Sequence, residues 1–344
     1  MDVRCWTLNV ERLLKVDISR QNGPAFRRAL LRWYSKHGRD LPWRRTRDPY
    51  RILVSEFMLQ QTQVATVLPY YKEWFRRFPN FAALARSSET DVIRAWQGLG
   101  YYARGRNLHA AAKLVVDKYR GRFPRNLREI RELPGIGKYT AHAVATFAFD
   151  QSVPIVEANT ARVLARLFDL RIPIDSTAGQ RMLWNRATSM VPSRRAGAYN
   201  SALLDLGALV CLPRNPTCGI CPVKKFCRAK HAEALPVKRP RPQTKRLTEK
   251  HALVVSENKI LLQLATDRWR GMWILPAANG NSRNQRPVYR AVFPFTNHRI
   301  SLEIFRGSNR KIDKRHRWFS KRGVKLIPIP SPHRRAIEQL LANA

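Results

Sequence analysis

The sequence predicts a mainly α-helical region followed by a smaller α+β domain, and three features of the chain support this division. From Pro24 to about Lys230, apolar residues recur at the three- and four-residue spacing of amphipathic helices. A basic, proline-rich segment follows at residues 231–249. Beyond residue 250 the spacing becomes that of short strands. A chain of 344 residues is long enough to form a separate core in each part.

Four segments carry the helical pattern, and glycine or proline residues interrupt them. They span residues 24–38, 51–78, 91–119 and 138–149. The run SSETD at 87–91 is a typical helix start, because serine caps a helix and acidic residues favour its first turn. Residues 1–23 show no such pattern and are expected to form an N-terminal extension.

Residues 250–344 are expected to form the α+β domain. The runs HALVVS and KILLQL, joined by Glu257 and Asn258, predict a hairpin. RAVFPF, HRISLEIFRG and RWFSK predict further strands, and SPHRRAIEQLLANA predicts a closing helix. Three prolines and six Lys or Arg residues at 235–250 predict an extended, solvated linker before this domain.

The charge of the chain favours a polyanionic partner. Lys and Arg number 64 against 24 Asp and Glu, which gives a net charge of +40. Charge alone leaves nucleic acid and an anionic membrane surface open. No run of 18 apolar residues occurs, and the N-terminal residues have no unbroken apolar core, so neither a membrane span nor a secretory signal is expected. The composition therefore favours an intracellular nucleic-acid-binding protein without membrane attachment.

A cysteine cluster lies near the end of the helical region. Four cysteines are separated by six, two and five residues, whereas Cys5 stands apart and is expected to be an ordinary thiol. In an intracellular protein such a cluster favours thiolate ligands around a metal over disulfides. Four thiolates in one loop favour a [4Fe–4S] cluster over zinc, and both remain open on spacing alone. The candidate ligands are Cys211, Cys218, Cys221 and Cys227.

The run LPGIGKYTA (133–141) joins two helical segments through Gly135 and Gly137. Backbone N–H groups of such a turn, at a helix N-terminus, can bind a phosphate without contacting a base. Lys138 adds a cation next to the turn. The alternative is a plain helix–turn–helix connection, and only the basic composition and the cysteine cluster favour DNA binding.

Two carboxylates are candidates for catalysis. Glu56 lies inside the apolar helix ILVSEFMLQQTQVATV, where partial desolvation would raise its pKa toward that of a general acid. Glu157 lies between the apolar run VPIV and the helix ANTARVLARLF. A solvated charge at a helix edge or helix start is the alternative for each. The polar run Gln60, Gln61 and Thr62 is suited to filling a gap in a base stack.

Five motifs together resemble a known family. SEFMLQQTQVATVLPYYKEWFRRFP, GLGYYARGRNLHAAA, LPGIGKYTA, ANTARVLAR and the cysteine loop after LGALVC occur in order between about residues 25 and 230. They are similar to the MutY-type adenine DNA glycosylases of the helix–hairpin–helix superfamily. The resemblance implies helical glycosylase domains over 24–230 with a [4Fe–4S] loop at 211–227. It also implies removal of adenine opposite 8-oxoguanine or guanine in double-stranded DNA, by a monomer in the cytoplasm (nucleoid-associated) of a bacterial-type cell.

The resemblance also implies roles for individual residues. Glu56 would protonate adenine, and Glu157 would stabilise the cationic sugar. Tyr139 and Asn159 would orient these groups. Tyr139 stands where lyase-active relatives carry a Schiff-base lysine, so weak or no lyase activity is expected. The adenine pocket would be lined by Trp43, Arg44, Leu59 and Ser201. DNA contacts would come from Gln60, Gln61, Thr62, Tyr101, Gly135, Gly137 and Lys138, with Gln61 and Tyr101 inserted into the base stack.

Three positions depart from the family pattern. Glu157 replaces the usual Asp, and Ser201 replaces a usual Glu or Gln. In the family's Phe-Ser-His motif for 8-oxoguanine, Phe295 and Thr296 align, but Asn297 replaces His, with His298 one position later. The changes at Glu157 and Ser201 keep open a mismatch glycosylase with another base choice, such as thymine opposite guanine. A catalytically silent DNA-binding protein is the alternative from another class.

The run DRWRGMWILP (267–276) resembles the entry of a Nudix-like fold. Nucleotide hydrolysis by such a fold needs carboxylates around Mg²⁺. No acidic residue lies between Asp267 and Glu303. The domain at 250–344 is therefore expected to read the mismatch rather than to hydrolyse nucleotides.

Overall fold

The computed structural model describes residues 22–240, 242–278, 285–307 and 312–342. The predicted extension at 1–23, with Cys5, lies outside these residues except at its last two positions. The chain divides into two compact units. The first is Met1–Glu56 with Phe123–Pro240, and the second is Phe57–Arg122 with Arg241–Ala344. The helical region predicted as one block at 24–230 is thus shared between two units.

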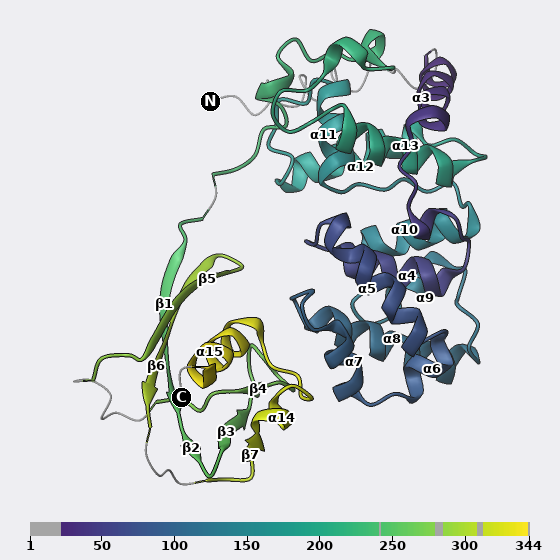
Figure 1. Ribbon diagram of the computed structural model, residues 1–344. Helices are drawn as coiled ribbons and strands as arrows, with labels where there is room; N and C mark the ends of the chain where they lie inside the picture. The colour runs from purple at the N-terminus through teal and green to yellow at the C-terminus, as the bar shows by residue number, and fades with distance from the viewer. Residues whose placement is uncertain (1–21, 241, 279–284, 308–311, 343–344) are drawn as a thin grey trace. The chain divides into compact units, whose positions relative to one another are not determined.

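The first unit is helical (Figure 1). Helix α13 is strongly apolar and packs against α3, α10 and α11, around a core that includes Phe26, Leu164 and Tyr199. Burial of this core provides the main favourable free energy of folding. Its helices are α3 (Gly23–His37), α4 (Pro49–Leu59, which continues into the second unit), α9 (Leu127–Glu132), α10 (Lys138–Phe149), α11 (Ala158–Leu167), α12 (Thr177–Met190) and α13 (Ala196–Leu209). Single 3₁₀ turns lie at Pro42–Arg44 (η1), Cys218–Ile220 (η2), Lys224–Phe226 (η3) and Ala232–Ala234 (η4).

The helical part of the second unit contains two breaks. The predicted helical segment 51–78 forms two helices, because Gln61 adopts a left-handed backbone conformation (φ 56°) after α4. The segment 91–119 is divided by Gly98 and Gly100, with φ of 105° and 71°. Ser88 is the N-cap of α7, as predicted. Its hydroxyl accepts a hydrogen bond from the Asp91 N–H at 3.1 Å. The helices are α5 (Val64–Arg77), α6 (Phe81–Arg86), α7 (Glu89–Trp96) and α8 (Ala103–Tyr119).

Residues after 241 form two small sheets with two helices. One sheet has the order β1–β6–β5, with β6 parallel to β1 and antiparallel to β5. In the other, β3 pairs with β2, β4 and β7. Helix α15 packs against β5 and buries Ala336 and Ile337. The elements are β1 (Lys245–Leu253), β2 (Val255–Ser256), β3 (Lys259–Leu264), β4 (Trp273–Ile274), β5 (Tyr289–Phe295), β6 (His298–Arg306), β7 (His316–Ser320), α14 (Lys321–Val324) and α15 (Ser331–Ala342).

The start of this domain differs from the prediction. The predicted hairpin exists as β2 and β3, and its turn residues Glu257 and Asn258 have φ of 45° and 61°. Strand β1 begins at Lys245, however, inside the segment 231–249 that was expected to be linker. Prolines cannot donate to a sheet, and the last of them is Pro242, so the backbone beyond it is free to pair with β6.

In the described part of the chain, every helix is too short or too polar to cross a lipid bilayer.

Candidate active site and nucleic-acid interface

Glu56 is a buried carboxylic acid on α4. Its side chain is 6% exposed, and its neighbours on the helix are apolar. Burial raises its pKa, a hydrogen bond from the Tyr139 hydroxyl lowers it, the charge of Glu157 raises it, and the charge of Arg44 lowers it. The net result is a pKa of about 7. Glu56 is therefore poised to donate a proton near neutral pH.

Tyr139 lies on the first turn of α10 and donates to Glu56. Burial and the two nearby carboxylates raise the pKa of its hydroxyl well above 10, so the phenol remains a neutral donor. The preceding residue faces a different partner, because the Lys138 ammonium lies 3.7 Å from the centre of the Trp184 ring. The Tyr139 phenol therefore faces Glu56, whereas the Lys138 amine faces Trp184.

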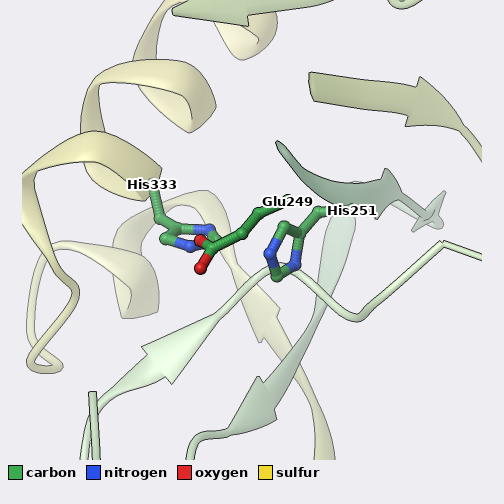
Figure 2. Close-up of side chains that lie close together, drawn as sticks. All are labelled: Glu249, His251 and His333. Atoms are coloured by element: carbon green, nitrogen blue, oxygen red, sulfur yellow. The ribbon is translucent and has the colours of Figure 1, made fainter. Parts of the chain in front are cut away.

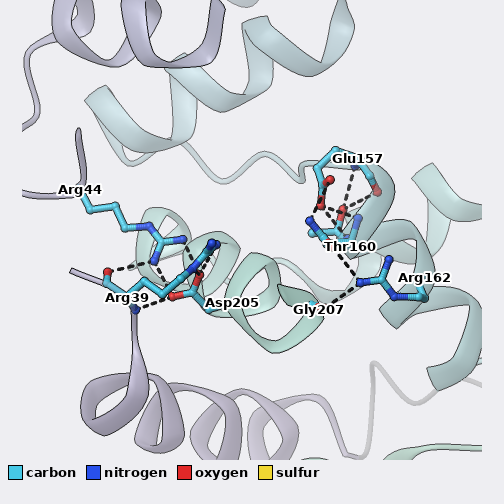
Figure 3. A network of polar contacts seen from close by, with 8 residues as sticks. Arg39, Arg44, Glu157, Thr160, Arg162, Asp205 and Gly207 are labelled. Carbon is cyan, nitrogen blue, oxygen red and sulfur yellow. Dashed lines mark hydrogen bonds and ion pairs between the residues drawn. The ribbon is translucent and has the colours of Figure 1, made fainter. Parts of the chain in front are cut away.

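Glu157 is the N-cap of α11. Its Oε1 accepts hydrogen bonds from the backbone N–H groups of Asn159 (2.7 Å) and Thr160 (2.9 Å), and Thr160 Oγ1 accepts from the Glu157 N–H, which completes a capping box (Figure 3). The carboxylate therefore faces the positive end of the helix dipole. Glu157 therefore lies at a helix start, but as a half-buried, hydrogen-bonded cap rather than as a solvated charge, and this position is compatible with a second role.

Asn159 connects Glu157 to the cysteine loop. Its amide donates to Glu157 Oε2 at 3.3 Å, and its Oδ1 accepts from Arg162 Nη2 at 2.8 Å. The same Arg162 guanidinium donates to the Gly207 carbonyl at 2.7 Å (Figure 3). It also donates to the Cys211 carbonyl at 2.7 Å. Hydrogen bonds through Asn159 and Arg162 thus connect the Glu157 carboxylate to the backbone of the cysteine loop.

We expect Gly207→Ala to disturb these hydrogen bonds. A Cβ at Gly207 would lie 2.7 Å from Asn159 Cβ and 3.0 Å from the Asn159 carbonyl oxygen, so the backbone of α11 must shift. Such overpacking costs ~1–3 kcal/mol. A displacement of about 1 Å at Asn159 lowers a catalytic rate ~100-fold. Thermal unfolding and single-turnover kinetics on mismatched DNA measure the two effects. Gly23→Ala, where the nearest atom to a Cβ is Arg27 Nη1 at an ordinary 3.4 Å, is the matched control.

Asp205 was not predicted from the sequence, yet it organises the site. It is fully buried on α13 and accepts hydrogen bonds from Arg44 Nη2 (2.8 Å), Arg39 Nε (2.7 Å) and the Arg39 N–H (2.8 Å) (Figure 3). Burial raises the pKa of Asp205, but the hydrogen bonds and charges of these arginines outweigh burial and lower it. The ionised carboxylate fixes Arg44, whose charge acts on Glu56. One acidic residue within an apolar helix was the signal, as it was for Glu56.

The predicted pocket residues fall into two groups. Trp43, on η1, is 8% exposed, and Ser201 is 6% exposed one helical turn before Asp205. Both belong to the first unit, with Arg44. Leu59 is half-buried at the end of α4 and belongs to the second unit. The first unit alone therefore brings together Trp43, Arg44 and the catalytic candidates.

Two exposed turns of the second unit carry the residues predicted to enter the base stack. Gln61 and Tyr101 are both exposed, and both have left-handed backbones, with φ of 56° and 46°. Gln60 and Thr62, also predicted as DNA contacts, are half-buried. The buried guanidinium of Arg104 connects both turns. It donates to the carbonyls of Phe57, Met58, Gln60, Leu99 and Gly100 and to the hydroxyl of Thr62.

We expect Arg104→Lys to loosen both turns. Arg104 is 7% exposed, and burial lowers its pKa to about 10, against a smaller opposing effect of Tyr101. An ammonium has three donors and lacks the planar fork, so several buried carbonyls would lose their partner. The free energy of unfolding should fall by roughly 2–4 kcal/mol in chemical denaturation. Arg120→Lys, at an exposed position, is the control, and an equal loss there would contradict the assignment.

The predicted hairpin lies between α9 and α10. Gly135 has a φ of 74°, which requires glycine, and Gly137 is the exposed N-cap of α10. The N–H groups that open α10 point toward this end of the helix. The turn thus lies at the N-terminus of a helix beside Lys138, which is exposed and whose ammonium contacts the Trp184 ring.

The four cysteines form one group in the first unit. Cys218 and Cys227 are exposed, and Cys211 and Cys221 are half-buried. Burial and the charges of the other three sulfur atoms raise the pKa of Cys221 to about 11. Arg166, 1% exposed, donates to Cys211 Sγ at 3.2 Å and to the Leu212 carbonyl at 2.7 Å.

The spacing of these sulfur atoms tests the two candidate metals. A tetrahedral zinc ion with Zn–S bonds of about 2.3 Å needs sulfur atoms about 3.8 Å apart. Within the part of the chain that the structure describes, no three of the four sulfur atoms form a group whose members all lie within 4.8 Å of one another. The described sulfur atoms are therefore farther apart than the ligands of a single tetrahedral zinc ion.

The predicted reading turn joins β5 to β6. Phe295 pairs with His298 across the hairpin, and Thr296 and Asn297 form its two-residue turn, with Thr296 at φ 51°. The Phe295 ring contacts Trp269 edge to face at 5.5 Å. A short, exposed turn on a sheet is thus available for contact with a partner.

These features define a class of protein. The hairpin and the buried acid occur on helices that match the HhH-GPD superfamily base excision DNA repair protein model at residues 54–182, and the cysteine loop at 211–227 follows the matched residues. A solved thermostable thymine-DNA glycosylase shares this fold, with a TM-score of 0.56 and 31% identity over 62% of this chain and 98% of that chain. The curated adenine DNA glycosylase of Buchnera aphidicola subsp. Acyrthosiphon pisum is 35% identical over 73% of each chain. The chain belongs to the adenine DNA glycosylase family.

The similarity to the human relative covers a smaller share of that protein. The human adenine DNA glycosylase is 45% identical over 215 residues, which are 60% of this chain and 39% of that protein. The chain therefore spans about two fifths of the human relative that it matches.

Proposed function

We propose that the protein is a monofunctional DNA glycosylase that hydrolyses the N-glycosidic bond of adenine mispaired with 8-oxoguanine or guanine. The observation that carries this proposal is the buried Glu56, with a pKa of about 7, which accepts from Tyr139 and lies in the field of Glu157. Two carboxylates in different environments are what bond cleavage at a sugar carbon requires, one protonated and one ionised.

In this proposal Glu56 is the acid. Its proton passes to N7 of the flipped adenine as the bond between the base and C1′ lengthens, and the base leaves as a neutral molecule. Tyr139 holds the carboxyl group by a hydrogen bond and keeps its orientation. The Asp205–Arg44 ion pair fixes a cation near the carboxylate that remains.

Glu157 is the carboxylate that stabilises the developing positive charge on the sugar. Asn159 and the N-terminus of α11 hold it in place. Its Oε1 is occupied by two backbone N–H groups, and its Oε2 has a 3.3 Å contact with the Asn159 amide. Oε2 is thus the more loosely held oxygen and the one suited to face the sugar cation.

Position 139, where lyase-active relatives carry a lysine nucleophile, is a tyrosine in this chain. A lyase step needs an amine that forms an imine with the sugar, and Tyr139 has none. The neighbouring Lys138 packs on Trp184. This arrangement supports hydrolysis by water without strand cleavage. Borohydride trapping should accordingly give no covalent complex.

DNA binding would combine the hairpin and the two exposed turns. The α10 N-terminus with Gly135 and Gly137 supports phosphate binding. Gln61 and Tyr101 are suited to fill the gap left by the flipped base and to contact the opposing purine, because both project from turns that Arg104 fixes. The net charge of +40 favours duplex DNA as partner, with strong salt dependence.

A [4Fe–4S] cluster is proposed as the cofactor, held by Cys211, Cys218, Cys221 and Cys227. The wide sulfur spacing and the Arg166 donor at Cys211 support it. When bound, the cluster supplies iron–thiolate bonds that cross-link the loop. Arg162 then ties the Cys211 carbonyl to Asn159, so the loop supports the position of the catalytic carboxylate.

The C-terminal domain is proposed as a Nudix-like reader of the base opposite adenine. The Phe295–His298 turn supports this role, because it is short and places Thr296 and Asn297 at the tip. Asn297 offers an amide in place of an imidazole, so discrimination of 8-oxoguanine from guanine would depend on amide hydrogen bonds. We further propose that the protein acts as a monomer in the cytoplasm, associated with the nucleoid.

Single-turnover excision tests the function directly. Duplexes with adenine opposite 8-oxoguanine, adenine opposite guanine and thymine opposite guanine would be incubated with excess protein, and alkali would reveal abasic sites. Adenine excision alone is the expected result. Selective thymine excision would favour the thymine-DNA glycosylase relationship instead. Tight binding without excision of either base would identify a silent DNA-binding protein.

A further inference from the structure

Three side chains of metal-ligating type meet in the C-terminal domain (Figure 2). Glu249 and His251 are two residues apart on β1 and therefore project from the same face of the strand. His333 comes from the first turn of α15. One ligand atom from each residue lies within 4.8 Å of the other two. None of the three belongs to the proposed excision site or to the reading turn.

The surroundings of these residues match those of a metal centre. His251 Nδ1 donates to the Leu275 carbonyl at 2.6 Å, in the tautomer that leaves Nε2 unprotonated. Arg268 donates to Glu249. Metal-bound histidines typically donate their second N–H to a backbone carbonyl, and metal-bound carboxylates are themselves hydrogen-bonded.

His333 provides the second, independent observation. It is fully buried, and its Nε2 has no hydrogen-bond partner among the described residues. A buried polar atom without a partner costs ~1–3 kcal/mol. Its Nδ1 accepts a hydrogen bond from the Leu275 N–H at 3.4 Å. This distance exceeds the usual range, so the contact is too weak to fix the ring proton on Nε2. The His333 ring meets His251 edge to face at 4.6 Å.

The donor set and the opening select the metal. Two imidazoles and one carboxylate suit zinc, whereas Mg²⁺ and Ca²⁺ prefer oxygen ligands alone. A cavity of about 390 Å³ is lined by Glu249, His251 and Arg268, so a fourth ligand, such as water, can reach the site. Arg268 and Arg315 on the cavity wall oppose a cation, and the Glu249 carboxylate offsets part of their charge.

We propose that Glu249, His251 and His333 form a zinc site that joins the first strand of the C-terminal domain to its last helix. The ion would replace the missing hydrogen bond of His333 and tie β1 to α15. Zinc would therefore stabilise the domain without taking part in base excision. This inference is independent of which base the protein removes.

Cobalt(II) titration of the purified full-length protein, with its cysteine loop loaded, tests the site. We expect one equivalent of cobalt to bind with d–d absorption and without thiolate charge-transfer bands, and zinc to displace it. His251→Gln, His333→Gln and Glu249→Gln should each lose this equivalent. His298→Gln, at the reading turn, should retain it. Zinc should raise the melting temperature of the wild type by several degrees and leave that of the three variants unchanged.

Three outcomes would overturn the proposal. The first is the absence of any binding up to ~1 mM metal, because weaker binding falls in the range of non-specific contacts. The second is binding that all three variants retain. The third is the appearance of thiolate charge-transfer bands, which would place the metal on the cysteines. Glu249→Gln keeps the buried histidines and guards against a loss caused by misfolding. Circular dichroism of each variant would confirm that it is folded.

Discussion

Replacement of Glu56 by glutamine is expected to lower the single-turnover rate of adenine excision by ~10²–10⁴-fold, the usual contribution of a general acid. Glutamine keeps the shape of the side chain and can still accept from Tyr139, but it has no proton of suitable acidity to give to the base. In the wild type the rate should fall as the pH rises above about 7, because the pKa of Glu56 is about 7 and the protonated form is active. Rates measured between pH 5 and 9 would show this limb.

The same substitution should stabilise the fold, which separates chemistry from misfolding. The pKa of Glu56 is raised from its usual 4.5 to about 7. The stability that this group contributes is therefore complete below pH 4.5 and is lost as the pH rises through 7. Above pH 7, Glu56→Gln should gain up to roughly 3 kcal/mol in the free energy of unfolding. An inactive variant that is also less stable would argue that Glu56 is structural.

The sequence predicted the elements whose local signals are strong. The run KYTAHAVATFAF became α10 at the predicted residues, and Glu257–Asn258 became the predicted turn. The parallel pairing of β1 with β6 was not predictable, because it joins segments about 50 residues apart and leaves no local pattern. The segment 245–249 also carries the charges of a linker, although it is a strand.

The candidate site shows the same division. Glu56 could be predicted from one acidic residue in an apolar helix, and Asp205 carried the same signal. Its role depends on Arg39 and Arg44, more than 160 residues away, and only the folded structure brings them together. Arg104 gave no signal, since an arginine in a basic chain is expected to be solvated. Its importance lies in six acceptors that the end of α4 and the two turns supply.

Glu157 carries two functions that substitution can separate. Glu157→Ser removes the charge but retains a good N-cap, so α11 should remain stable. Glu157→Asp retains both charge and cap, with an arm shorter by one methylene. We expect the serine variant to lose ~10²–10³ in excision rate, as when one electrostatic contact to a transition state is removed. The aspartate variant should be faster than the serine variant, because the charge that faces the sugar remains.

The reason for this order lies in the geometry of the cap. Oε1 of Glu157 is held by two backbone N–H groups, which serine can replace with one hydroxyl oxygen. Oε2 accepts a hydrogen bond from the Asn159 amide at 3.3 Å, and the carboxylate carries the negative charge that serine lacks. Single-turnover rates and thermal unfolding should therefore diverge for Glu157→Ser. If both remain at wild-type values, Glu157 is a cap alone; if both fall together, the loss is one of folding, and the sugar-facing carboxylate must be sought elsewhere.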